Sequence, residues 1–179
     1  MNNTRFLLSA FLLFCFSAFL LSCNNSAPTG VIQSSSTTKD EINPYIVGNQ
    51  KIVELENEDI ELFLKRYPWK MTKTNTGLRY EITKQGKGKN METGETVTLE
   101  YRTFLLSGEE VYNSENEGIK SFVVDKSEET SGLHEAVKLM NKGSEARLII
   151  PSHLAYGTSG DRNRIKPYQT IIMKIVISD

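Results

Sequence analysis

The stretch SGLHEAVKLMNKG, residues 131–143, decides the fold, because it is a single helical pattern set among strand-like segments. Its apolar residues recur at the spacing of one helical face: Leu133, Ala136, Val137 and Met140. Ser131 is a residue type that favours the N-cap of a helix, and Asn141-Lys142-Gly143 is typical of a left-handed C-cap. We therefore predict one central helix over residues 132–140.

The segments on either side of this helix alternate apolar and polar residues, as strands with one buried face do. In residues 97–103, for example, Val97, Leu99 and Tyr101 alternate with polar residues. The other predicted strands are 78–83, 111–112, 119–125, 146–150 and 170–177, with turns at 85–89 and 107–110 and a polar loop before the last strand. The pattern predicts an α+β domain, in which an antiparallel sheet of five or six strands packs on the central helix.

The N-terminus has the pattern of a signal peptide. Arg5 precedes an apolar run over residues 6–21, which is shorter than the roughly 20 residues of a membrane span. The run closes on Leu20-Leu21-Ser22-Cys23, which resembles the lipobox of bacterial lipoproteins. We predict a signal peptide over 1–22, lipidation of Cys23 and, from its Ser/Thr-rich composition, a flexible tether over 23–50. The alternative is an ordinary secretory signal that ends near a cysteine.

A second helical pattern lies between the tether and the domain. Ile60, Phe63, Leu64 and Tyr67 share one face, and Pro68 ends the helix. We predict a helical extension over 51–70 and the α+β domain over 71–179. The apolar face either packs on its own domain, which we favour, or pairs with another helix.

Composition excludes several classes of function. The formal net charge is −1, and removal of residues 1–22, which carry one basic and no acidic residue, makes it −2. This balance argues against a nucleic-acid partner. Cys15 and Cys23 are the only cysteines, and both belong to the predicted signal and anchor, so the domain has no disulfide and no cysteine nucleophile. The two histidines lack ligand spacing, and no motif implies a metal or another cofactor.

Four strings occur in a characteristic order: GETVTLEY at 94–101, GEEVYNS at 108–114, GLHEAVKLMNKG at 132–143 and PSHLAYG at 151–157, followed by the apolar last strand. From about residue 76 to 177 the chain resembles the FKBP-type peptidyl-prolyl isomerases. The resemblance implies an FKBP-like sheet wrapped on one central helix. Together with the lipobox and the predicted helical extension, which is rich in acidic residues, GDRNRI at 160–165 resembles the gliding-motility-associated FKBP-type lipoproteins of Bacteroidetes.

The family's chemistry is rotation about X–Pro bonds, which needs no acid–base pair. An apolar pocket disfavours the charge-separated planar amide, whose rotation barrier is about 18–20 kcal/mol, and placed donors hold the flanking carbonyls. Carried over by position, the resemblance implies Tyr156, Tyr101 and Asn113 as catalytic residues. The implied substrate-binding residues are Tyr112, Phe122, Thr130, Leu133, Ile165 and Met173. In this assignment the Tyr156 hydroxyl donates to a substrate carbonyl. The alternative for each tyrosine is a half-buried core residue with its hydroxyl in water.

Several positions depart from the family pattern. Leu133 stands where active members usually carry Trp, Lys120 at an aromatic wall position, and Asn113 where Asp is usual. A shallower, more polar pocket excludes water less well, so two functions remain open. The first is an isomerase that acts on envelope or secreted proteins. The second is a non-catalytic FKBP-like binding or chaperone module of a motility or secretion apparatus.

Both functions imply partners and a location. The expected partners are proline-containing polypeptides, motility or secretion proteins, and the membrane through lipidated Cys23. The expected location is the cell envelope, with the lipid anchor in the outer membrane and the domain facing the periplasm.

Overall fold

The computed structural model describes residues 44–179, and side chains from residue 48. The predicted signal peptide, the predicted lipidation site Cys23 and residues 23–43 of the predicted tether lie outside the described residues.

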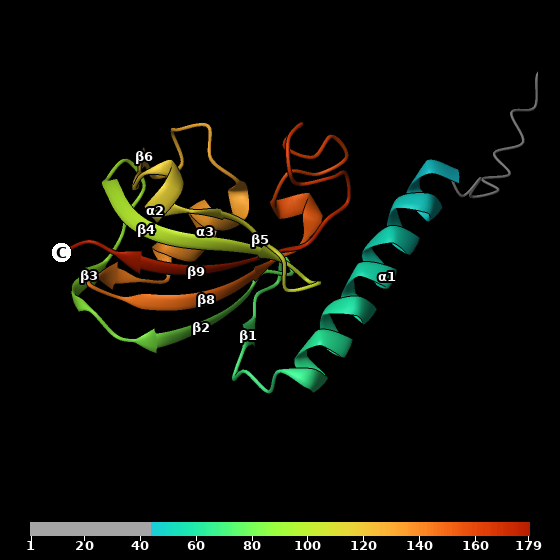
Figure 1. Cartoon of the computed structure of the whole chain (residues 1–179), viewed down its shortest axis with the longest axis horizontal. Coiled ribbons are helices and arrows are strands. Elements are labelled where there is room, and N and C mark those ends of the chain that lie inside the picture. The colour runs from blue at the N-terminus through green and yellow to red at the C-terminus, as the bar shows by residue number, and fades with distance from the viewer. Residues whose placement is uncertain (1–43) are drawn as a thin grey trace, which may run out of the picture. The chain divides into compact units, whose positions relative to one another are not determined.

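A seven-stranded antiparallel sheet forms the body of the domain (Figure 1). Its strands are β1 (Thr72–Lys73), β2 (Arg79–Lys84), β4 (Thr96–Leu105), β5 (Glu110–Asn113), β6 (Lys120–Val123), β8 (Glu145–Ile150) and β9 (Ile171–Ile177). The order is β1-β2-β8-β9-β4-β5, and β6 pairs with β4 beside β5. The α+β prediction is confirmed. The seventh strand is β1, whose two residues are too few to show an alternating pattern.

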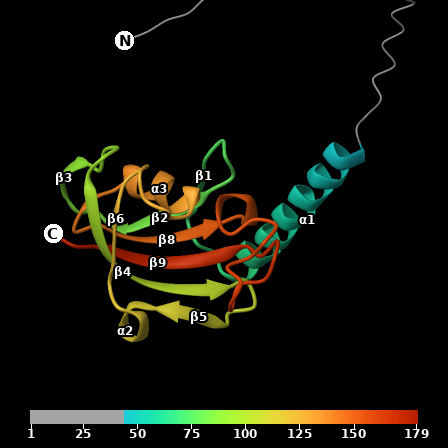
Figure 2. The same cartoon turned by 90° about the horizontal axis from the view of Figure 1, so that it is seen from above.

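The helix α3 (Ser131–Lys138) lies against one face of this sheet, here called the inner face (Figure 2). Leu133, Ala136 and Val137 enter the main core with Leu99 and Leu148 from the sheet. Because side chains alternate along a strand, the odd-numbered residues of β9 point into this core and Lys174 and Val176 point away from it.

Two details of the predicted helix are wrong. Its N-cap is Thr130, and Ser131 is its first helical residue. At the other end the helix stops at Lys138, and Asn141–Lys142 forms strand β7, which pairs with β3 (Lys87–Asn90). The predicted turn over 85–89 therefore contains part of a strand. The Asn141 side chain binds Ser144 and the Gly88 carbonyl, so it ties these segments together instead of capping the helix.

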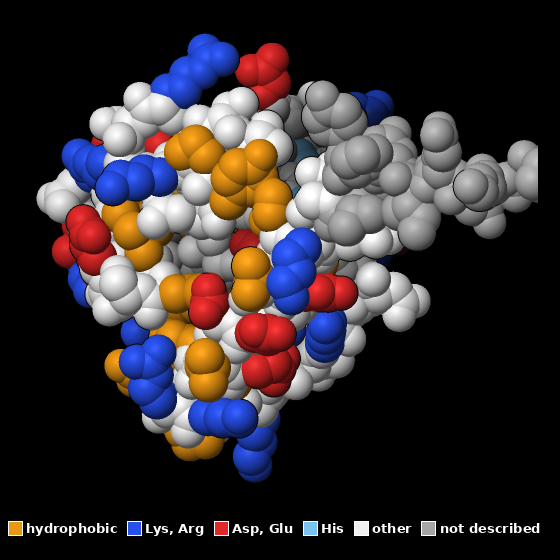
Figure 3. Space-filling view, turned by 90° about the vertical axis from the view of Figure 1, so that its right-hand side faces the viewer, with side chains coloured by type: hydrophobic (Ala, Val, Ile, Leu, Met, Phe, Trp, Pro, Cys, Tyr) orange, Lys and Arg blue, Asp and Glu red, His pale blue; other side chains and the backbone are white. Residues whose placement is uncertain are grey.

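The helix α1 (Pro44–Arg66) packs on the outer face of the sheet. Ile60 and Phe63 bury against Ile149 and Ile172, whose side chains point away from α3. Buried Arg79 on β2 adds hydrogen bonds from its Nη2 to Asn57 Oδ1 at 3.0 Å and to Glu61 Oε1 at 2.8 Å. This helix packs on its own domain. The side of the molecule where α1 lies, which is the right-hand side of Figure 1, mixes hydrophobic side chains with acidic and basic ones (Figure 3).

The first residue of α1 corrects the predicted tether boundary. The helix begins at Pro44, so residues 44–50 are helical rather than part of the tether. Proline is well tolerated at the first helical position, where its missing N–H costs no hydrogen bond and its fixed φ suits the helix. Apolar spacing alone does not reveal such a start.

Two short helical elements complete the fold. Helix α2 (Ser114–Glu117) follows β5, and the 3₁₀ helix η1 (Ser152–Leu154) opens the loop between β8 and β9. This loop, residues 151–170, is called the site loop below. Gly132 of α3 lies so close to it that a Cβ atom there would stand 3.1 Å from the Leu154 carbonyl oxygen.

Candidate active site

A pocket of about 250 Å³ lies between α3, the inner face of the sheet and the site loop. Strands β4, β5 and β9 supply part of its wall, α3 supplies the floor, and the site loop closes one side. The lining residues are Tyr101, Thr103, Tyr112, Glu117, Lys120, Glu129, Thr130, Leu133, Tyr156, Asp161, Ile171 and Met173.

The floor is apolar. Leu133 from the first turn of α3 is 1% exposed, and Ile171 and Met173 reach it from β9. These side chains offer no group that solvates an amide carbonyl. A proline ring and the peptide bond before it would therefore leave water on entering this pocket.

Three tyrosines form the walls. Tyr101 comes from β4, Tyr112 from β5 and Tyr156 from the residues just after η1. Burial, and then the charges of Glu129 and Asp161, raise the pKa of Tyr156 to about 12. Its hydroxyl therefore keeps its proton at neutral pH. Among residues 44–179 this hydroxyl has no hydrogen-bond partner, so it is available as a donor.

Tyr112 is held in place by an acid. Its hydroxyl donates to Asp161 Oδ2, while Asp161 Oδ1 accepts from the amides of Asn163 and Ile165, both at 2.8 Å. Burial acts to raise the pKa of Asp161, but these hydrogen bonds outweigh it, so the pKa lies below its ordinary value. For Tyr112, burial and then the bond to Asp161 raise the pKa.

The mouth of the pocket is charged. Lys120 Nζ lies 2.7 Å from Glu129 Oε1 and 5.3 Å from the centre of the Tyr101 ring. Arg164 pairs with the lining residue Glu117 at 3.2 Å, and its guanidinium lies 4.9 Å from the centre of the Tyr112 ring. The sequence predicts a polar residue at this wall position, and in the structure Lys120 forms an ion pair there. Charge patterns in the sequence do not reveal it, because Lys120 and Glu129 come from separate segments.

Six of the nine site residues implied by the resemblance meet in this pocket: Tyr101, Tyr112, Thr130, Leu133, Tyr156 and Met173. The other three do not line it. Asn113 caps α2, with its Oδ1 accepting from the Asn116 amide at 2.9 Å. Phe122 and Ile165 are both buried in the main core, and the centres of the Phe122 and His134 rings lie 5.2 Å apart in a T-shaped pair.

Sequence reasoning missed five lining residues as site components: Thr103, Glu117, Glu129, Asp161 and Ile171. The sequence contains a signal for one of these residues, Asp161. Asp161 precedes Asn163 in a loop rich in glycine, a pattern typical of an aspartate that binds the backbone two residues on. The others depend on strand register and on contacts between distant segments.

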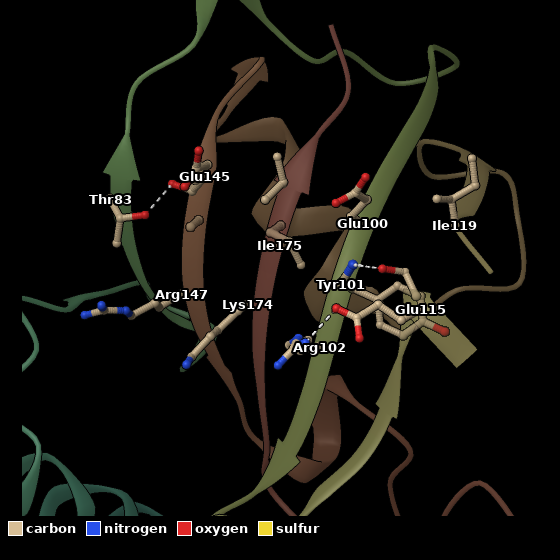
Figure 4. A pocket seen from close by; sticks show the side chains of 13 residues that line it. Thr83, Glu100, Tyr101, Arg102, Glu115, Ile119, Glu145, Arg147, Lys174 and Ile175 are labelled. Atoms are coloured by element: carbon tan, nitrogen blue, oxygen red, sulfur yellow. Dashed lines mark hydrogen bonds and ion pairs between the residues drawn. The ribbon is translucent and has the colours of Figure 1, made fainter. Parts of the chain in front are cut away.

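A larger hollow of about 480 Å³ lies on the outer face of the sheet (Figure 4). A row of cations in register across three strands lines it: Arg147 on β8, Lys174 on β9 and Arg102 on β4. Arg102 donates to Glu115 at 2.7 Å. Exposed, charged walls cannot exclude water from a peptide bond, so the smaller pocket is the better candidate site.

Among residues 44–179, no group of acidic, histidine or cysteine side chains is arranged to hold a metal ion. Nor does any helix there have the length and apolarity needed to cross a membrane.

Comparison with known proteins agrees with this geometry. The model of the FKBP-type peptidyl-prolyl cis-trans isomerase family matches residues 87–178, just over half of the chain. The chain belongs to this family. Helix α1 lies before the matched region.

Individual relatives give the same result. The chain is 36% identical over 117 residues to the probable FKBP-type peptidyl-prolyl cis-trans isomerase FkpA of Neisseria meningitidis, covering 64% of this chain and 43% of the relative. It is 35% identical over 100 residues to the outer membrane protein MIP of Legionella longbeachae, covering 56% and 42%. The crystal structure of FkpA from Escherichia coli superposes with a TM-score of 0.62 at 29% identity, covering 75% of this chain and 63% of that one. The chain thus spans less than half the length of the two curated relatives named here.

Proposed function

We propose that this protein is a peptidyl-prolyl cis-trans isomerase whose active site is the pocket between α3 and the site loop. The observation that carries the proposal is the combination of a buried apolar floor with the unpartnered, protonated hydroxyl of Tyr156. Rotation about an X–Pro bond needs these two features and no nucleophile.

The mechanism follows from amide chemistry. A planar amide carries charge separation that water stabilises, and the twisted amide loses it, so a dry pocket favours the twisted state. Leu133 and Met173 displace water from the X–Pro bond. Tyr156 donates to a substrate carbonyl and holds the chain on one side of that bond, so that the other side rotates.

The experiment is exchange NMR on Leu-Pro and Phe-Pro test peptides, which reads isomerisation without a coupled protease. Tyr156→Phe removes one donor and should lower kcat/KM several-fold, which corresponds to about 0.5–1.5 kcal/mol. Tyr168→Phe is the matched control, because Tyr168 lies on the same loop but is exposed and outside the pocket. Loss of activity in both variants, or in neither, contradicts the assignment of Tyr156.

A second function is favoured by one observation, the Lys120–Glu129 ion pair at the pocket mouth. Charges there retain water and weaken the desolvation on which catalysis depends. In this case the domain binds proline-containing segments without turning them over. This second function is supported if wild-type protein broadens the NMR signals of the peptide by binding but leaves its cis–trans exchange rate unchanged.

The cellular location of the protein and the identity of its clients are also proposals. The lipobox-like tetrad ending at Cys23 and the relative named outer membrane protein MIP support a lipid anchor in the outer membrane. The clients would then be envelope or secreted polypeptides, and the narrower resemblance adds motility or secretion proteins. Cys23→Ser should abolish fatty-acid labelling and release the protein from membranes, whereas Cys15→Ser should do neither. Wild-type protein that takes up no label refutes the anchor.

A further inference from the structure

Glu56 on α1 is a buried acid that faces the catalytic domain. It is 9% exposed, and none of the basic side chains among residues 44–179 pairs with it. Three donors satisfy its carboxylate instead. The Ser152 amide donates to Oε1 at 2.6 Å, the Ser152 hydroxyl donates to Oε2 at 3.0 Å, and the Thr170 hydroxyl donates to Oε1.

These donors are the two ends of the site loop. Ser152 opens η1 and is separated from β8 only by Pro151, and Thr170 is the last residue before β9. Glu56 Oε1 accepts from both Ser152 and Thr170, so it holds the two ends of the site loop together. The intervening residues carry Tyr156 and Asp161, which line the pocket.

A short hydrogen-bonded path leads from the carboxylate to the pocket wall. The carbonyl of Ser152 accepts from the Gly157 amide at 2.8 Å, and the carbonyl of Gly157 accepts from the Tyr168 amide at 2.9 Å. The residue before Gly157 is Tyr156. A shift of Ser152 would therefore move the backbone that sets the direction of the Tyr156 side chain.

Packing of α1 does not require an acid at this position. Ile60 and Phe63 already bury the helix on the sheet, in an apolar cluster that does not include residue 56. A buried carboxylate costs free energy unless all its bonds are made. Here they are made, and each goes to an end of the site loop.

We propose that Glu56 is a positioning residue, through which α1 fixes the site loop and so the placement of Tyr156 over the pocket. This inference rests on the proposed function for its catalytic consequence, but not for its structural one. It extends the functional unit to a helix outside residues 87–178, the region that the family model matches.

The test uses the full chain and two readouts, amide hydrogen exchange and isomerisation kinetics. In Glu56→Ala the amides of Gly157 and Ile165 should exchange about tenfold faster, while the amides of β9 stay unchanged. The same variant should lower kcat several-fold and leave KM unchanged, since the apolar floor is intact. Glu56→Gln keeps a carbonyl acceptor and should recover part of both effects. Glu58→Ala, an exposed acid on the same helix, should change neither.

Unchanged exchange of the loop amides in folded Glu56→Ala overturns the proposal, and so does equal acceleration across β9, which indicates general destabilisation. If Glu56→Ala does not fold, Thr170→Val decides. It removes one donor without changing shape and should speed loop exchange, whereas Thr170→Ser should not. If the loop amides respond but wild-type protein shows no isomerisation, the positioning role stands and the proposed function fails.

Discussion

Gly132 and Gly48 are both helical glycines, but their surroundings differ. A Cβ atom at Gly132 would stand 2.4 Å from Ile150 Cγ2 and 3.2 Å from Leu154 Cβ, and Ile150 is fully buried. A Cβ atom at Gly48 meets nothing within 4 Å. Replacement by alanine at both sites therefore separates helix propensity from packing.

The expected magnitudes have opposite signs. Alanine gains up to about 1 kcal/mol over glycine in a helix, and Gly48→Ala should show most of that gain. At Gly132 overpacking costs about 1–3 kcal/mol, so the net effect should be a loss of about 1–2 kcal/mol. Because the displaced neighbours include Leu154, Gly132→Ala should also disturb the pocket.

Urea unfolding followed by circular dichroism measures both values, and the fluorescence of Trp69, the single tryptophan, reports on the interface with α1. The two variants should move the unfolding midpoint in opposite directions. Equal stabilisation would refute the close approach of α3 to β8 and the site loop. Destabilisation by Gly48→Ala would refute the helical assignment of the start of α1.

Three other changes test separate parts of the molecule. Leu133→Trp widens the apolar floor and should raise kcat/KM in the exchange assay if the pocket accepts the extra volume. The pKa of Tyr156, raised by burial, lies at about 12 in the folded chain against 10.0 ordinarily. Its contribution to stability should be complete below pH 10 and fall between pH 10 and 12, which tyrosinate absorbance and alkaline unfolding will show. Lys174→Glu places an acid between Arg102 and Arg147 at the centre of the cation row. It should raise the free energy of unfolding by about 0.2–1 kcal/mol in low salt.

Each of these has a contradicting outcome. A folded Leu133→Trp variant with lower activity shows that the pocket has no room for the larger side chain. A tyrosine titration that finishes with ordinary pKa values contradicts the burial of Tyr156. A stability gain at Lys174 that persists in high salt is not electrostatic, because salt screens exposed charges.

The sequence predicts the fold well where the pattern is local. The alternation in residues 97–103 and the helical spacing from Leu133 to Met140 each depend on residues close together, and both elements are present. The pairing of β3 with β7 and the start of α1 at Pro44 were missed, because the first depends on a distant partner and the second on backbone geometry.

The site is less predictable than the fold. Tyr101, Tyr112 and Tyr156 were placed by resemblance, and they share a pocket. Asn113 lies one residue from Tyr112, yet its side chain points to the opposite side of β5 and caps α2, as strand alternation requires. In the sequence, Glu56 is one acid among several on a charged helix. Only the packing of α1 turns that acid, unlike Glu54 and Glu58, toward the domain.

The position of β9 bears on how this domain folds. It lies between β8 and β4 and pairs Leu105 with Ile171 and Leu99 with Ile177, so the centre of the sheet joins segments far apart in the chain. Contacts of this kind form slowly, because a long loop must close before any of them is made. Until then β4 and β8 each keep an open, apolar edge of the sort that other chains can join. The domain is thus most exposed to aggregation while β9 is being synthesised, and substitutions that weaken β9 should reduce the yield of folded protein before they alter the finished pocket.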